Sequence, residues 1–197
     1  MLSLEKKQEK RKRIAKSTCN LFLEKGYVKI TISEIAKVAG IGKGTIYEYF
    51  SNKEDIIFEL MACLQEEYDE ILKEKLAQNI TTKEKLISLF DIFLSTDEKV
   101  QTQRKIYKEF LSIYINNKTD AMDTYNTKMM EKYKDILRNI LKDSIERKEI
   151  SQISLSFVSS IFATLQGYFI MNEETNMMYE YIDNIFMLFE LNQKELI

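Results

Sequence analysis

The most informative segment of this chain is TISEIAKVAGIGKGTIYEYF, residues 31–50. Thr31 with Glu34 three residues later is the pattern of a capping box, so a short helix is predicted to begin after Thr31. Gly40 accommodates the positive φ that reverses the chain, and a second short helix is predicted to begin near Lys43. Two short helices joined by a glycine turn predict a helix-turn-helix. The inward-facing residues of the first short helix recur at helical spacing: Ile32, Ile35, Ala36 and Ala39.

The second short helix has two different sides. Ile41 and Ile46 give it an apolar side that anchors it to the interior. Basic, hydroxyl and aromatic side chains on the opposite side suit base edges, thymine methyl groups and phosphates. The sequence therefore predicts that this helix reads the major groove of DNA. The residues of the outward side are Lys43, Thr45, Tyr47 and Tyr49, with the backbone of Gly44 able to approach a surface closely.

Glycine and proline are scarce outside this segment. The chain of 197 residues has no Pro and five Gly, so a nearly all-helical protein is expected. We predict about nine helices: an N-terminal three-helix domain at 1–53 that binds DNA, joined by a long fourth helix to a C-terminal helical domain at 54–197. The predicted helices outside the helix-turn-helix lie at about 5–25, 53–78, 82–95, 98–117, 120–148, 153–172 and 176–194.

Charge is distributed unevenly between these two parts. Residues 1–53 contain 12 Lys and Arg against 5 Asp and Glu, whereas residues 54–197 contain 17 against 26. A basic first quarter on an acidic remainder predicts that the N-terminal part meets a polyanion. Charge alone leaves open the alternative of a solvated charged helix.

The chain contains no His, and its two cysteines, Cys19 and Cys63, match no metal-binding spacing. Without His, no Ser-His-Asp triad, Cys-His pair or HExxH zinc site can form, so no enzyme, metal site or cofactor is expected. The cysteines are typical of reduced thiols in a cytosolic protein. The sequence has no apolar run of about 18 residues, which a membrane span needs, and no secretory signal peptide is recognised because the chain is charged from Glu5 onward. A cytoplasmic protein without a membrane partner is therefore predicted.

The helix-turn-helix segment carries a family resemblance. From residue 31 the chain reads TISEIAKVAGIGKGTIYEYFSNKEDII, which resembles the N-terminal DNA-binding segment of the TetR family of regulators. The resemblance covers about residues 8–60. It includes the family's G-T-[LI]-Y-x-[HY]-F pattern at residues 44–50, followed by the S-N-K-E-[DE] that opens the next helix.

The resemblance implies that both short helices contact DNA. Thr31 is expected to meet a phosphate, and the residues that open the second helix are expected to meet bases or backbone. The two tyrosines of that helix are expected to contact phosphates, and Lys53 is expected to clamp the DNA backbone. The expected DNA-binding residues are therefore Thr31, Lys43, Gly44, Thr45, Tyr47, Tyr49 and Lys53.

Two positions depart from the common family pattern. Gly42 stands where Ser or Thr is common, so a hydroxyl that caps the second helix or contacts DNA is missing. Tyr49 replaces the commoner His. The basic run at 6–13 is a further candidate for DNA contact, with a merely solubilising tail as the alternative.

The acidic remainder shows no catalytic constellation but is rich in Phe, Tyr and Met. Core packing explains most of these residues, and the resemblance implies that some of them instead line an apolar pocket for a small effector. Adaptable Met side chains suit such a pocket, and a largely apolar or aromatic effector is expected. The candidates are Phe90, Phe93, Tyr107, Phe110, Tyr114, Met122, Tyr125, Met129, Phe162 and Phe169.

The last two helices are the expected dimer interface, because the resemblance implies that they pair into a four-helix bundle. Apolar residues recur there at spacings of three and four, and an intramolecular core face is the alternative. Gly167 would allow helices to approach closely. The candidate interface residues are Phe157, Ile161, Leu165, Tyr168, Ile182, Ile185, Phe186 and Phe189.

These expectations combine into one functional hypothesis. The chain is expected to be a homodimeric repressor that binds a pseudo-palindromic DNA operator and is released by a small, largely apolar effector. The alternative is a helical-bundle small-molecule-binding or scaffold protein without sequence-specific DNA binding. Specific retardation of its own promoter DNA separates the two.

Overall fold

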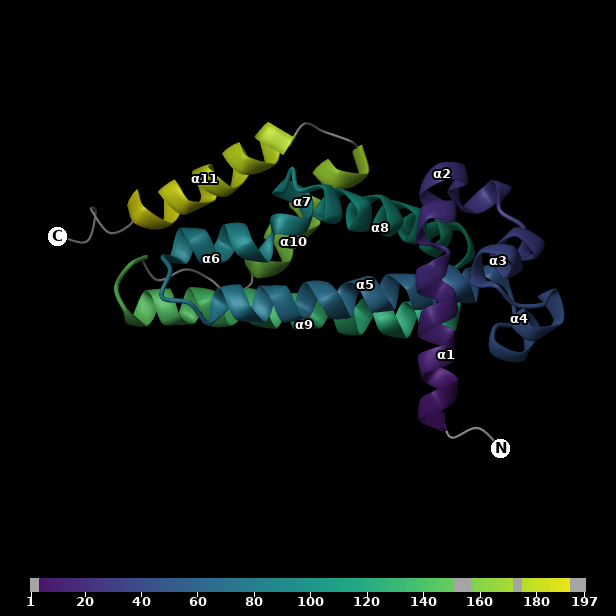
Figure 1. Cartoon of the computed structure of the whole chain (residues 1–197). Coiled ribbons are helices and arrows are strands. Elements are labelled where there is room, and N and C mark those ends of the chain that lie inside the picture. The colour runs from purple at the N-terminus through teal and green to yellow at the C-terminus, as the bar shows by residue number, and fades with distance from the viewer. Residues whose placement is uncertain (1–3, 151–156, 172–174, 192–197) are drawn as a thin grey trace. The chain divides into compact units, whose positions relative to one another are not determined.

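The computed structural model describes residues 4–150, 157–171 and 175–191. Within these ranges the chain forms eleven α-helices and no β-strand, which confirms the all-α fold (Figure 1). The helices are α1 (Leu4–Ser17), α2 (Cys19–Lys29), α3 (Ile32–Ala39), α4 (Lys43–Tyr49), α5 (Lys53–Leu76), α6 (Thr82–Leu89), α7 (Asp91–Leu94), α8 (Glu98–Asn117), α9 (Asp120–Glu146), α10 (Phe157–Met171) and α11 (Thr175–Leu191).

The helices belong to two compact units. Unit 1 comprises Met1–Glu70 and Gln101–Asp123, and unit 2 comprises Ile71–Val100 and Thr124–Ile197. The long helices α5 and α9 each contribute residues to both units. In the part of the chain that the structure describes, no helix is both long enough and apolar enough to cross a membrane.

The helix-turn-helix in unit 1 has the local geometry that its sequence predicts. The Thr31 Oγ1 accepts a hydrogen bond from the Glu34 amide at 3.3 Å, and the Glu34 carboxylate accepts one from the Thr31 amide at 2.9 Å. This reciprocal capping box starts α3, and Gly40 ends it in the left-handed conformation, at φ 65° and ψ 33°. The next long helix begins after Asn52, whose Oδ1 accepts from the Asp55 amide at 2.7 Å.

Two of the predicted helices are interrupted. The first one breaks into α1 and α2 at Thr18, whose amide and hydroxyl both bond the Ala15 carbonyl, at 3.0 Å and 2.6 Å. These tighter bonds replace the regular i to i−4 bond at that point. The second break is at Phe90, with φ −101° and ψ 10°, between α6 and α7. The apolar period continues across both breaks, so the pattern alone predicts unbroken helices.

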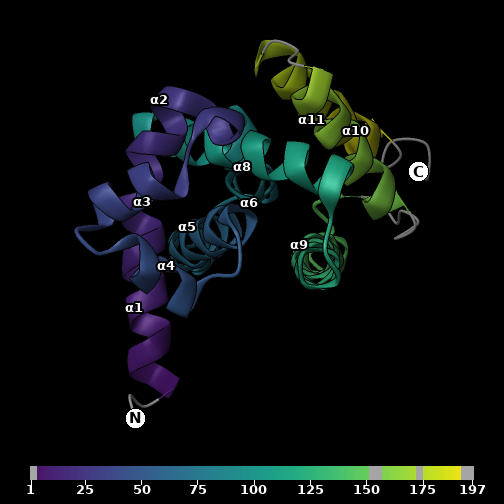
Figure 2. The same ribbon diagram turned by 90° about the vertical axis from the view of Figure 1, so that its right-hand side faces the viewer.

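Each unit has its own apolar core. In unit 1, α1, α3 and α4 are grouped beside α5, which Figure 2 shows nearly end-on. In unit 2, α11 packs against α6 and α7, and an ion pair of 2.9 Å joins Lys83 on α6 to Asp183 on α11. The largest fully buried side chains of unit 1 are Ile14, Phe22, Ile35, Ile46, Phe50, Ile56, Ile57, Leu60 and Phe110; those of unit 2 are Phe90, Leu94 and Phe169.

Candidate DNA-binding interface

Helix α4 has one anchored side and one accessible side. Ile46 is fully buried and Phe50, the residue at its C-cap, is 2 % exposed. Lys43 and Gly44 are exposed at its first turn, and no atom lies within 4 Å of a Cβ added at Gly44. Further along the helix, Tyr47 is 53 % exposed, while Thr45 and Tyr49 are half-buried. This arrangement leaves the first turn of α4 and the side that carries Tyr47 open to a large polyanion such as a nucleic acid.

Thr31 is exposed at the start of α3, but its side chain takes part in the cap. Its hydroxyl donates to the Glu34 carboxylate at 2.8 Å and accepts from the Glu34 amide. The Lys25 ammonium and the Thr31 donors lower the pKa of Glu34 to about 2, so this carboxylate is ionised and paired. A phosphate contact by Thr31 stays a prediction, and its capping role is visible in the structure.

Lys53 lies at the first position of α5 and has an internal role that the sequence did not suggest. Its Nζ donates to the backbone carbonyls of Tyr27 at 2.9 Å, Val28 at 3.2 Å and Ile30 at 3.0 Å. A Lys ammonium has three N–H donors, and here each has a carbonyl acceptor. The phosphate clamp therefore stays a prediction, whereas the structure gives Lys53 the role of a cap on the end of α2.

Tyr27 adds a second contact to α5 and links this cap to α8. Its hydroxyl hydrogen-bonds the Glu54 carboxylate on α5, and its amide donates to the Glu109 Oε2 on α8 at 2.9 Å. Burial and the Glu54 carboxylate raise the pKa of Tyr27 well above its ordinary value. These partners lie 27 and 82 residues away in the sequence, so no local pattern signals them.

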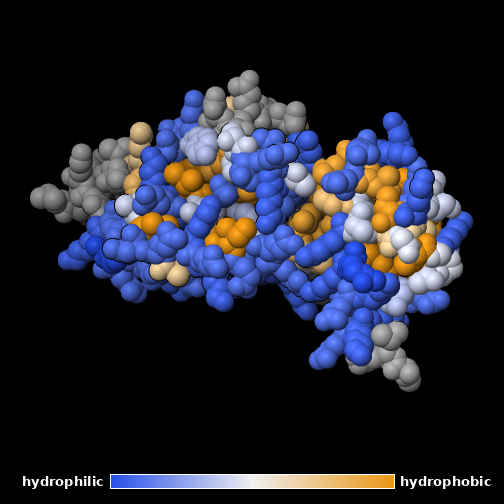
Figure 3. All heavy atoms as spheres, viewed as in Figure 1, coloured by the Kyte–Doolittle hydropathy of each residue, from blue (hydrophilic) through white to orange (hydrophobic). Residues whose placement is uncertain are grey.

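Helix α1 carries the basic run that was a further candidate for DNA contact. Two lysines of α1 are paired with α5: Lys12, within the run, with Glu66 at 2.6 Å, and Lys16, just after the run, with Glu67 at 2.7 Å. The N-terminal turns of α1 project away from α4 (Figure 2), and their surface is hydrophilic (Figure 3). Lys6 and Lys7 are exposed there.

The candidate pocket residues are mostly buried, in two groups that lie in different units. In unit 1, the Phe110 ring stacks with the rings of Phe58 and Tyr107, each at 6.4 Å, and with that of Tyr114 at 6.0 Å. Met122, also in this unit, is 1 % exposed. In unit 2, two ring pairs pack edge-on or tilted: Phe90 with Phe162 at 5.2 Å, and Phe93 with Phe169 at 5.4 Å.

Tyr125 and Met129 complete the set on the unit 2 part of α9. Met129 is buried and Tyr125 is half-buried. Beside them, the side-chain oxygen of Asn126 is buried and has no hydrogen-bond partner among the described residues. A buried acceptor without a partner is costly, and a group that donates a hydrogen bond would satisfy it.

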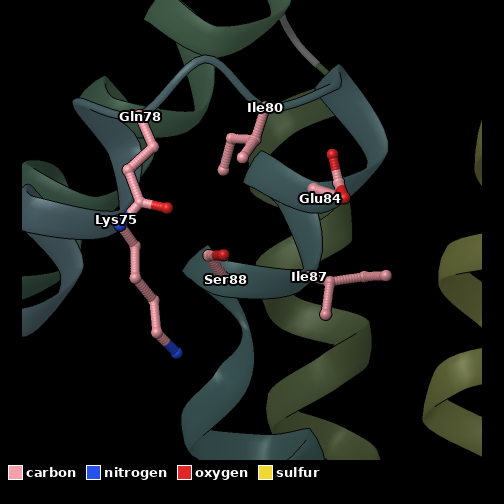
Figure 4. Close-up of a pocket in the computed structure, with 6 residues that line it drawn as sticks. All are labelled: Lys75, Gln78, Ile80, Glu84, Ile87 and Ser88. Atoms are coloured by element: carbon pink, nitrogen blue, oxygen red, sulfur yellow. The ribbon is translucent and has the colours of Figure 1, made fainter.

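A pocket of about 300 Å³ lies elsewhere in unit 2, between the end of α5 and α6 (Figure 4). Its wall combines apolar Ile80 and Ile87 with polar side chains, and the Lys75 ammonium also pairs with Asp91 at 3.4 Å. It shares no residue with the predicted effector set. The lining residues are Lys75, Gln78, Ile80, Glu84, Ile87 and Ser88.

The candidate dimer residues divide by exposure. Four of them are buried within the chain itself: Ile161, Leu165, Ile182 and Ile185. Phe157 is 44 % exposed, whereas Tyr168 and Phe186 are half-buried, and the Phe189 side chain lies outside the described residues. Other large apolar side chains of α10 and α11 are exposed instead: Ile170, Met171, Met177, Tyr179 and Met187.

Comparisons with known proteins agree with the helix-turn-helix geometry. Residues 14–60 match the model of the bacterial regulatory proteins of the tetR family. The fatty acid metabolism regulator protein of Bacillus subtilis (strain 168) is 29 % identical over 152 residues, which cover 76 % of this chain and 75 % of that protein.

Solved structures show the same likeness along most of the chain. A putative fatty acid metabolism regulator from Clostridium perfringens is 27 % identical, with a TM-score of 0.59, over 89 % of this chain and 95 % of that one. The fold alone is shared with a TetR-family transcriptional regulator from Cytophaga hutchinsonii, which is 20 % identical, with a TM-score of 0.76, over 96 % of this chain and 98 % of that one.

Proposed function

Because the chain belongs to the TetR family of DNA-binding transcriptional regulators, we propose that it is a homodimeric repressor whose two α4 helices read a pseudo-palindromic operator. The observation that carries this proposal is the exposed polar side of α4 opposite buried Ile46 and Phe50. Residues 1–53 bind DNA, and residues 54–197 bind the effector and form the dimer. The two recognition helices meet successive major grooves, about 34–36 Å apart.

The exposed apolar side chains of α10 and α11 support dimerisation through these helices. Ile170, Met171, Met177 and Met187 are each more than two-fifths exposed in the single chain. Burying such side chains against a second copy is favourable by about 25 cal/mol for each Å² of apolar surface removed from water. The proposed interface therefore centres on these residues and Phe157 rather than on the four that the chain buries itself.

The effector is proposed to contain a long acyl chain. The relatives from Bacillus subtilis and Clostridium perfringens are a regulator and a putative regulator of fatty acid metabolism. The chain is rich in Met and aromatic residues, several of them buried, such as Met122, Met129 and Phe162, and such side chains suit an apolar ligand. Effector binding makes the protein release DNA only if the effector binds the conformation with low DNA affinity better than the one that binds DNA.

Gel retardation with the DNA upstream of its own gene tests the proposal. We expect the protein to retard this DNA in the presence of excess shuffled competitor, and a long-chain fatty acid or acyl-CoA to reverse the retardation. Equal competition by the shuffled DNA would identify the chain as a helical-bundle protein without sequence-specific binding. Unchanged operator affinity with saturating acyl ligands would remove the effector assignment alone.

A further inference from the structure

We propose that Arg11 and Glu59 form a part-buried tether that sets the orientation of α4, so that Arg11 is a positioning residue and not a phosphate contact. This inference rests on the proposed DNA-reading function of α4. Arg11 belongs to the basic run of α1, where sequence reasoning makes every cation a candidate for DNA contact.

Glu59 is an acidic residue of unit 1 that follows the helix-turn-helix in the sequence. It lies on α5 and is 7 % exposed. Its two carboxylate oxygens are occupied from α1, by the Gln8 Nε2 at 2.8 Å and the Arg11 Nε at 3.0 Å. A buried carboxylate is costly unless it is paired and hydrogen-bonded, so this geometry fixes the guanidinium at one place.

The other edge of the same guanidinium contacts the C-terminal end of α4. The Arg11 Nη1 donates to the carbonyl of Tyr49, the last residue of α4. The guanidinium carbon lies 4.4 Å from the centroid of the Phe50 ring, at the C-cap. A cation at this end satisfies an orphan carbonyl and interacts favourably with the helix dipole. Arg11 thereby joins α1, α4 and α5.

The other end of α4 is held by backbone alone: it follows a short turn in which the Ile41 amide donates to the Ala36 carbonyl of α3 at 3.0 Å. Its N-cap is Gly42, which makes no side-chain hydrogen bond to the helix. Helix α4 has seven residues, and helices this short depend on tertiary contacts for their stability. Its orientation is therefore held by its packing against α3, by Ile46 and Phe50 in the core, and by the Arg11 tether at the C-terminal end.

The two possible roles of Arg11, positioning α4 or contacting a phosphate, predict opposite effects of a Glu59 substitution on DNA binding. Replacing Glu59 by Gln removes a negative charge, so electrostatics alone predicts tighter DNA binding. If Arg11 positions α4, the same substitution releases the tether and weakens operator binding. Glu66→Gln is the matched control, because it removes the same charge from α5 and breaks the Lys12 pair at 2.6 Å, which is formed with α1.

Hydrogen exchange of the DNA-free protein tests the tether without depending on DNA binding. We expect the amide of Phe50, which donates to the Ile46 carbonyl at 2.9 Å, to exchange about tenfold faster in Arg11→Gln and Glu59→Gln. Lys12→Gln and Glu66→Gln should leave it unchanged. Equal protection in all four variants would overturn the proposal. Thermal melting by circular dichroism shows whether each variant folds. If Arg11→Gln is unfolded, Arg11→Lys takes its place in the experiment, because lysine keeps the charge but lacks the planar fork of the guanidinium.

Operator titrations at several salt concentrations supply the second readout. We expect Arg11→Gln and Glu59→Gln to lower operator affinity about tenfold at each salt concentration, with an unchanged slope of log K against log [salt]. A slope reduced by about 0.9 in Arg11→Gln, or tighter binding by Glu59→Gln, would identify Arg11 as a phosphate contact. If the parent protein fails to bind, the proposed function fails, and the hydrogen exchange result still decides the tether.

Discussion

The Lys53 Nζ lies 2.9 Å from the backbone carbonyl oxygen of Tyr27 and 4.4 Å from the centroid of the Tyr27 ring. One ammonium thus joins the first residue of α5 to the C-terminal end of α2. The whole helix-turn-helix lies in sequence between these two residues. We infer that this contact closes the segment that presents α4 to DNA.

Lys53→Met should destabilise the protein by about 1–3 kcal/mol, because three carbonyls lose a charged donor. The phosphate-clamp role predicts a different signature, which is a reduced salt slope of operator binding with little loss of stability. Urea unfolding and a salt titration of DNA binding on the same variant separate the two roles. Lys29→Met, a change at an exposed position at the end of α2, is the control.

Gly44→Ala should separate stability from DNA binding. A Cβ at this position meets nothing within 4 Å in the protein, and Ala favours a helix interior over Gly by about 0.8–1.0 kcal/mol. We therefore expect a slightly higher melting temperature together with weaker operator binding, because the added methyl group would stand where the backbone is proposed to approach DNA. Unchanged operator affinity would show that Gly44 does not lie against DNA.

The capping box of α3 should make stability depend on acidic pH. The pKa of Glu34 is lowered to about 2, first by the Lys25 ammonium and then by Thr31. Its contribution is therefore present above its ordinary value of about 4.5 and is lost as the pH falls toward 2. The difference in unfolding free energy between the parent and Glu34→Gln should shrink over this range. In a Lys25→Met background the folded-state pKa should move back toward 4.5, so the loss should be smaller and should end at a higher pH. An identical pH profile in the two backgrounds would contradict Lys25 as the main cause.

Met171→Glu should break the dimer without unfolding the chain. Met171 is 73 % exposed, so a carboxylate there is solvated in a single chain and buried only in a dimer. Light scattering after gel filtration should show a monomer, and circular dichroism should show unchanged helical content. Leu165→Ala is the contrasting core variant, and it should cost about 2–5 kcal/mol of stability because Leu165 is fully buried. A dimeric Met171→Glu protein would place the interface elsewhere.

Local signals predicted local structure well. Thr31 with Glu34 and the glycine at residue 40 specify the start and end of α3 from within a few residues, and the structure confirms both. The helical period of α10 and α11 correctly indicated an apolar face. It did not indicate what covers that face, and the structure buries Leu165 and Ile182 within the chain.

Long-range partners explain what the sequence did not reveal. Arg11 meets Tyr49 and Glu59 from 38 and 48 residues away, and Lys53 meets carbonyls 23 to 26 residues away. In the sequence both cations look like any other basic residue near a DNA-binding motif. Only the fold shows that their charges are directed into the protein.

Hydroxyl-radical footprinting on the DNA upstream of the gene tests whether α4 reads an operator. We expect two protected half-sites whose centres lie about one helical turn apart, 10–10.5 base pairs or a multiple of it. We also expect that Lys43→Ala weakens this protection at fixed salt while leaving thermal stability and dimer formation unchanged. Equal protection by Lys43→Ala and the parent, or protection without paired half-sites, would contradict the assignment of α4 as the reading helix.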